Sequence, residues 1–75
     1  MNKIHRFRIE LSARECREFY QGLFTTIQVR TEGGLSLRLS AQHVRHFMTV
    51  GGVSGIFELQ IDENNKFISL HKISN

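Results

Sequence analysis

The stretch KIHRFRIELSARECREFYQG, residues 3–22, decides the fold class, because the spacing of its apolar side chains changes partway along. Phe7, Ile9 and Leu11 alternate with charged residues, which is the period of two expected of a half-buried β-strand. After Leu11 the apolar residues recur at helical spacing. A strand that leads directly into a helix indicates an α+β domain.

The helix in this stretch carries a start signal and a stop signal. Ser12 followed by Glu15 matches a capping box, in which each side chain satisfies a backbone N–H of the first turn. Gly22 stands where a left-handed residue commonly ends a helix. We therefore expect a helix over about residues 12–21, whose apolar face comprises Cys16, Phe19 and Tyr20.

Two alternating segments then flank the sequence TEGG and predict a β-hairpin. A three-residue loop, residues 32–34, pairs Val29 with Leu37 and Ile27 with Leu39, so that all four apolar side chains share one face. A two-residue loop would pair an arginine with a leucine. We therefore expect the three-residue loop, with a glycine at the position that needs a positive φ.

A second hairpin is predicted around two consecutive glycines. With a turn at residues 51–52, Val50 pairs with Val53 and Met48 pairs with Gly55. The large methionine side chain would then face a residue without one. The pattern indicates a short strand before the turn and a longer strand after it.

The last hairpin is predicted from Asn64-Asn65, since asparagine tolerates the left-handed backbone of a tight turn. This turn would place Ile61 opposite Ile68 and Leu59 opposite Leu70 on one apolar face.

These elements predict one α+β domain, residues 1–75, built on a small, strongly twisted antiparallel sheet or open barrel of five to six strands. One helix, at about 12–21, would cover it, and one short helical turn would lie at about 41–46. The predicted core comprises Phe7, Ile9, Leu11, Cys16, Phe19, Tyr20, Ile27, Val29, Leu37, Leu39, Val44, Met48, Val53, Phe57, Leu59, Ile61, Ile68 and Leu70.

Composition indicates the class of protein. The single cysteine, Cys16, excludes an internal disulfide, and no apolar run is long enough for a signal peptide or a membrane span. We therefore expect a soluble, cytoplasmic protein. The net charge of +3 is uneven, because residues 1–45 carry eight Lys and Arg against four acidic residues. This excess favours a polyanionic partner or forms a solvated face.

The segments LSARECREFYQG, AQHVRHF, GGVSGIFEL and DENNKFISL together resemble a family of short bacterial proteins, domain of unknown function 2835. The resemblance covers nearly the whole chain and is carried by Leu11, Ser12, Cys16, Tyr20, Gly22, His43, Arg45, Phe47, Gly52, Gly55, Phe57 and Asp62. It implies a compact bacterial domain without implying an activity, and it implies that position 46 need not be histidine.

The residues that could support chemistry do not form a recognisable site. His43 and His46 are three apart on a helical turn, a spacing that can chelate zinc, but a structural zinc site needs four ligands. His5 and His71 lie on different predicted strands, and Cys16 lies on the apolar face of the helix. We therefore expect no catalytic residues, no metal and no cofactor, and a protein that is not an enzyme.

Two surfaces remain as candidate sites. Arg6, Arg8, Arg30 and Arg38 fall on the outward side of strands, and would share one face if those strands are neighbours. Such a face binds nucleic acid weakly and without sequence preference when it lacks stacking aromatics, or is simply solvated.

The other surface is an apolar strip on the outward side of the last hairpin, comprising Ile56, Phe67 and Ile73. It would meet a protein partner, form a weak homodimer, or fold into a second small core. We expect a non-enzymatic protein-interaction module with an unidentified protein partner and no membrane contact. Nucleic-acid binding through the arginines is the alternative.

Overall fold

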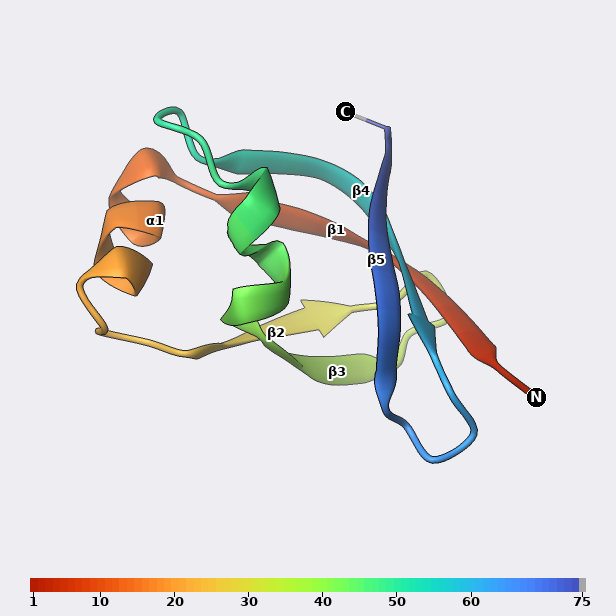
Figure 1. Ribbon diagram of the computed structural model, residues 1–75. Helices are drawn as coiled ribbons and strands as arrows, with labels where there is room; N and C mark the ends of the chain where they lie inside the picture. The colour runs from red at the N-terminus through yellow and green to blue at the C-terminus, as the bar shows by residue number, and fades with distance from the viewer. Residues whose placement is uncertain (75) are drawn as a thin grey trace.

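Five antiparallel strands make up most of the fold and divide between two sheets (Figure 1). The computed structural model describes residues 1–74. The three-stranded sheet has the order β1-β4-β5, with β1 at Lys3–Leu11, β4 at Val53–Ile61 and β5 at Phe67–Ser74. A separate hairpin joins β2, Thr26–Arg30, to β3, Ser36–Ser40. The helices are α1, Ala13–Tyr20, and the 3₁₀ helix η1, Ala41–Phe47.

This arrangement confirms the predicted α+β class, with five strands rather than six within residues 1–74. The sheets do not close into a barrel. The hairpin β2–β3 meets the larger sheet where Phe7 forms an isolated bridge with Thr31, and the amide of Glu32 donates to the carbonyl of Arg6 at 2.9 Å.

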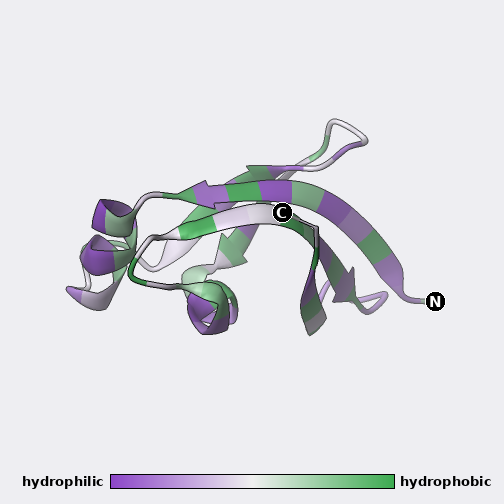
Figure 2. Ribbon diagram, turned by 90° about the horizontal axis from the view of Figure 1, so that it is seen from above, coloured by the Kyte–Doolittle hydropathy of each residue, from purple (hydrophilic) through white to green (hydrophobic). Residues whose placement is uncertain are grey.

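The alternation predicted for β1 is present. Phe7 and Ile9 are buried, whereas Arg6, Arg8 and Glu10 are exposed. Figure 2 shows the same alternation of hydrophilic and hydrophobic segments along the strands. One side of the larger sheet therefore packs on the core and the other meets solvent.

The predicted capping box begins α1. The hydroxyl of Ser12 accepts from the amide of Glu15 at 3.0 Å, and the carboxylate of Glu15 accepts from the amide of Ser12 at 2.9 Å. Gly22 has the predicted positive φ, 81°. The prediction that Phe19 and Tyr20 belong to the core is wrong. Phe19 is partly buried against the rings of Tyr20 and Phe24, and Tyr20, in the last turn of the helix, is 57% exposed, so Cys16 is the buried residue of α1.

The hairpin β2–β3 has the predicted register and the predicted three-residue loop. Val29 pairs with Leu37 and Ile27 with Leu39. The amide of Thr31 donates to the carbonyl of Leu35, which closes residues 32–34 as the loop. Gly34 takes the positive φ, 87°.

The hairpin predicted around Gly51-Gly52 is wrong. The bridge joins Thr49 to Gly52, so the turn is one residue earlier, and Val50 is fully exposed instead of pairing with Val53. The predicted partner of Met48, Gly55, pairs instead with Ile9 of β1. Packing explains the shift, because the backbone of Gly52 lies directly against the start of α1 and no residue with a side chain fits there.

The register of the last hairpin is only partly as predicted. Asp62 pairs with Lys66, so the loop has three residues, and the Asp62 carboxylate accepts from the amides of Asn64 and Lys66 at 2.8 and 2.9 Å. Asn65 adopts the expected left-handed backbone, φ 65°.

Beyond the loop, Ile61 lies opposite Phe67 instead of Ile68, and a β-bulge then restores the predicted pair of Leu59 with Leu70. The bulge leaves Ile68 44% exposed, outside the predicted core.

The core lies between the two sheets and η1. Phe57 is fully buried, and the ring of Phe47 on η1 meets it edge-on at 5.0 Å between centroids. The buried hydrophobic residues are Phe7, Ile9, Cys16, Val29, Leu39, Ala41, Val44, Val53, Phe57, Leu59, Ile61 and Leu70. Ala41 is the member that sequence reasoning missed. Leu11, Ile27, Leu37 and Met48 pack against this core while partly exposed.

Candidate functional site

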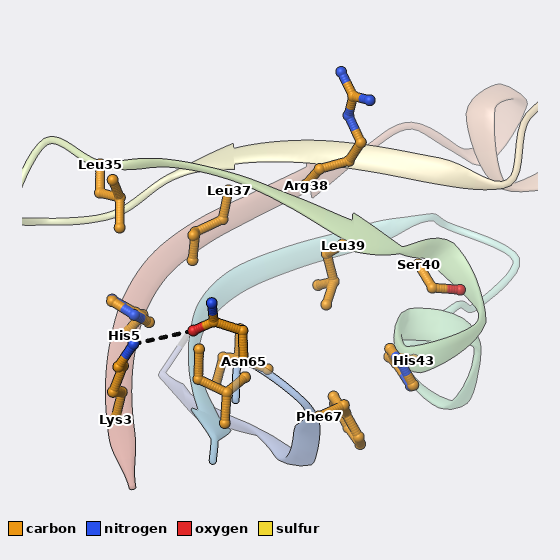
Figure 3. Close-up of a pocket in the computed structure, with 12 residues that line it drawn as sticks. Lys3, His5, Leu35, Leu37, Arg38, Leu39, Ser40, His43, Asn65 and Phe67 are labelled. Carbon is orange, nitrogen blue, oxygen red and sulfur yellow. Dashed lines mark hydrogen bonds between the residues drawn. The ribbon is translucent and has the colours of Figure 1, made fainter. Parts of the chain in front are cut away.

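A groove of about 650 Å³ lies between the hairpins β2–β3 and β4–β5 (Figure 3). Leu37 and Leu39 of β3 line it on one side, and Leu59 and Ile61 of β4 on the other. These are inward-facing residues, so the groove is a continuation of the core that the two hairpins leave uncovered.

Part of the apolar surface in this groove is accessible to solvent. Leu35, just before β3, is 51% exposed, and Phe67, the first residue of β5, is 39% exposed. A groove of this size and character is typical of a binding site for an apolar segment or molecule.

The wall formed by β3 includes backbone as well as side chains. Four consecutive residues, 37–40, line the groove, although neighbouring side chains on a strand point to opposite sides. Figure 3 shows Arg38 pointing away from the groove while Leu37 and Leu39 point into it. The strand has one ladder partner, β2, in the part of the chain described here. Its other edge is therefore open, with backbone groups available for pairing.

Two basic side chains lie at the end of the groove nearest Leu35. Lys3 pairs with Ile61 and His5 with Leu59 across β1 and β4, so both point to the inward side of the sheet. The ammonium of Lys3 donates to the amide oxygen of Asn65 at 3.1 Å (Figure 3). The core side of β1 thus changes from apolar to basic as it enters the groove.

His43 lies at the opposite end. Its imidazole stacks on the ring of Phe67 with parallel planes and centroids 3.7 Å apart. His46, three residues on, is exposed and shares a second, smaller hollow of about 320 Å³ with His43. Within residues 1–74 no three His, Cys, Asp or Glu side chains lie close enough together to hold a metal ion. His43 therefore contributes to the groove through its ring.

The four arginines predicted to share a face are divided between the two sheets. Arg6 and Arg8 lie on β1, and Arg30 and Arg38 lie on the hairpin, which touches β1 through the bridge at Phe7. The Arg6 guanidinium binds Glu58 at 2.9 Å, and that of Arg8 lies 3.5 Å from Glu10. Two of the four charges therefore already have a carboxylate partner.

The predicted apolar strip does not assemble as expected. Phe67 pairs with buried Ile61 and lines the groove, so it is on the inward side of the sheet. Ile56 pairs with Ser74, because a second bulge shifts the register between Ile56 and Phe57. The homodimer inferred from this strip stays a prediction, and Phe67 no longer supports it.

Cys16 is almost fully buried on α1, as predicted. Burial raises the pKa of its thiol, and the carboxylate of neighbouring Glu15 raises that pKa further. A neutral, buried thiol is a poor nucleophile, so Cys16 is placed to pack and not to react.

Sequence reasoning did not find the groove, although one signal for it existed. Lys3 and His5 have the same parity as Phe7 and Ile9, so the apolar face of β1 ends in two basic residues. The angle between the two hairpins, which opens the groove, depends on contacts between residues far apart in the chain.

No helix of residues 1–74 has the length and apolar character needed to cross a membrane. Searches among curated proteins and among solved structures find no match to this chain. The family model described as protein of unknown function (DUF2835) matches residues 3–73, and the chain therefore belongs to that family.

Proposed function

We propose that this protein is a non-enzymatic interaction module that holds an extended segment of a partner protein in the groove between its two hairpins. The segment pairs through its backbone with the open edge of β3 and places alternate side chains on the apolar floor. Strand addition of this kind is a recurrent way for a small sheet to recognise a peptide, because main-chain hydrogen bonds give affinity and side-chain pockets give specificity.

The observation that carries the proposal is the coincidence of two features in one place. The open edge of β3 lines the groove over residues 37–40, and exposed apolar surface from Leu35 and Phe67 lies beside it. An exposed sheet edge beside an apolar hollow is a liability for a protein that acts alone, because it invites aggregation. A partner strand would satisfy both surfaces.

The proposal includes a reducing, cytoplasmic setting, which the single free thiol of Cys16 supports. Weak, sequence-independent binding of nucleic acid is the second candidate. It is supported by Arg30 and Arg38, for which no carboxylate lies within ion-pair distance among residues 1–74. The outward positions of β2 and β3 offer no aromatic ring for base stacking, which favours the first candidate.

The test is a selection with the full chain against a displayed library of random twelve-residue peptides. The amide resonances of the protein are then followed as an enriched peptide is added. We expect shifts concentrated at residues 37–40 and at Phe67. Peptides that shift the resonances of Arg6, Arg8 and Arg30 instead, or a library that yields no binder, would contradict the proposal.

A matched pair of variants locates the site. Leu35 and Leu23 are both exposed leucines outside the core, but only Leu35 lines the groove. Leu35→Asp is expected to weaken peptide binding about tenfold, the effect of removing a moderate interface contact. Leu23→Asp is expected to leave the affinity unchanged. Equal affinities of the two variants would show that the peptide binds elsewhere.

A further inference from the structure

We propose that the partner segment carries a carboxylate at one end of its apolar stretch, and that Lys3 is the residue that selects it. This inference rests on the proposed function and adds the chemistry of the partner to it. The carboxylate would lie at the Leu35 end of the groove, where the inward side of β1 becomes basic.

The charged side chains that line the groove are those of Lys3 and Arg38, and both are cationic. The imidazoles of His5 and His43 also line it, and no Asp or Glu does. An apolar segment that also bears a negative charge therefore complements this surface better than a neutral or basic one. Arg38 points outward (Figure 3), which leaves the ammonium of Lys3 as the cation on the inward side.

The ammonium of Lys3 lacks an ionic partner within residues 1–74. It donates a hydrogen bond to the neutral amide of Asn65. The carboxylate in the same turn, Glu63, binds the amino group of Met1 at 3.1 Å instead. By contrast Arg6, Arg8 and Arg14 each lie within 3.5 Å of a glutamate. Lys3 thus differs from these cations in having its charge free while it faces an apolar groove.

The position of Lys3 predicts where the carboxylate of a partner segment paired along β3 would lie. Lys3 and His5 lie at the end of the groove near Leu35, and His43 lies at the other end, near Ser40 (Figure 3). A segment paired along β3 would therefore meet apolar side chains along its middle and the ammonium near one terminus. The selected peptides should carry Asp or Glu at a fixed distance from their apolar residues.

The closing experiment repeats the peptide selection against the wild-type chain, Lys3→Gln and Lys66→Gln. Lys66 is the matched control, since it is an exposed lysine of the neighbouring turn that does not line the groove. We expect the wild type and Lys66→Gln to enrich an acidic residue at one fixed position. Lys3→Gln should enrich the apolar pattern without the acidic residue.

One enriched peptide and its Asp→Asn analogue then measure the interaction. We expect the analogue to bind the wild type about three- to fivefold more weakly, as for an ion pair open to solvent. For Lys3→Gln the two peptides should bind equally, because the partner of the carboxylate is gone. The preference for the acidic peptide should also decrease as salt is added.

The outcomes separate this inference from the proposed function. Groove-binding peptides without an acidic preference, or a preference that survives in Lys3→Gln, overturn the selection by Lys3 alone. A library without groove-binding peptides overturns both. Resonances of residues 37–40 that shift with protein concentration, in the absence of peptide, would show a second copy in the groove and overturn the acidic partner.

Discussion

Gly52→Ala tests the packing between the start of β4 and the start of α1. The backbone of Gly52 has φ 100°, a conformation that costs a residue with a side chain about 1–2 kcal/mol. An added methyl group would also overlap the carbonyl oxygen of Leu11 and come within 3.0 Å of the carbonyl carbon of Ser12. Both are backbone atoms, so the strand or the helix must move to admit it. We expect a total loss of about 3–5 kcal/mol of folding free energy.

Gly34→Ala supplies the matched control. Gly34 has a similar φ, 87°, but a methyl group there would meet no atom within 4 Å. It should therefore cost only the conformational term, about 1–2 kcal/mol. Urea unfolding monitored by circular dichroism would measure the loss of folding free energy in both variants. In a thermal scan the Gly34→Ala protein should melt about 4–16 °C below the wild type. Equal losses in the two variants would refute the reasoning, because they would show that space around Gly52 is not limiting.

Two further changes follow from the core. Phe57→Ala removes a fully buried ring that Phe47 contacts edge-on, and it should lower the folding free energy by about 3–5 kcal/mol in urea unfolding. Ile4→Ala, which truncates an exposed residue, is the control. A loss for Phe57→Ala no greater than that for Ile4→Ala would contradict the assigned inward face. The raised pKa of the Cys16 thiol means that the unfolded chain loses its thiol proton at lower pH than the folded chain. The contribution of this thiol to the free energy of unfolding is therefore fully present below the pKa of the unfolded thiol and is lost as pH rises from there through the folded pKa. Cys16→Ala should remove this part of the alkaline decrease in unfolding free energy, and an unchanged pH dependence would count against the burial argument.

The sequence predicted those parts of the fold that depend on neighbours in the chain. Ser12 and Glu15 are three residues apart, and the loop at residues 32–34 is closed by its own flanking pair, so both were visible as patterns. The Asn64-Asn65 pattern predicts the wrong loop length. The carboxylate of Asp62 accepts hydrogen bonds from the amides of Asn64 and Lys66 and so closes a three-residue loop.

Features that depend on distant segments could not be predicted in this way. The glycine pair at residues 51–52 predicts a hairpin turn, and the sequence alone does not show that the backbone of Leu11 lies against Gly52. The bulges of β5 and the groove itself arise from how two hairpins pack, which no local pattern encodes.

The pairing of β1 with β4 has a consequence for the order in which the chain can fold. Lys3 pairs with Ile61, whereas the hairpins β2–β3 and β4–β5 each join segments that are close in sequence. Both hairpins can form within microseconds, but β1 can pair with β4 only after the longer loop between Leu11 and Val53 has closed. During synthesis β1 leaves the ribosome before the other strands and cannot pair with β4 until residues 53–61 have been made. Lys3 and His5, which line the groove, belong to β1, so we expect this end of the groove to form only after β1 has paired with β4.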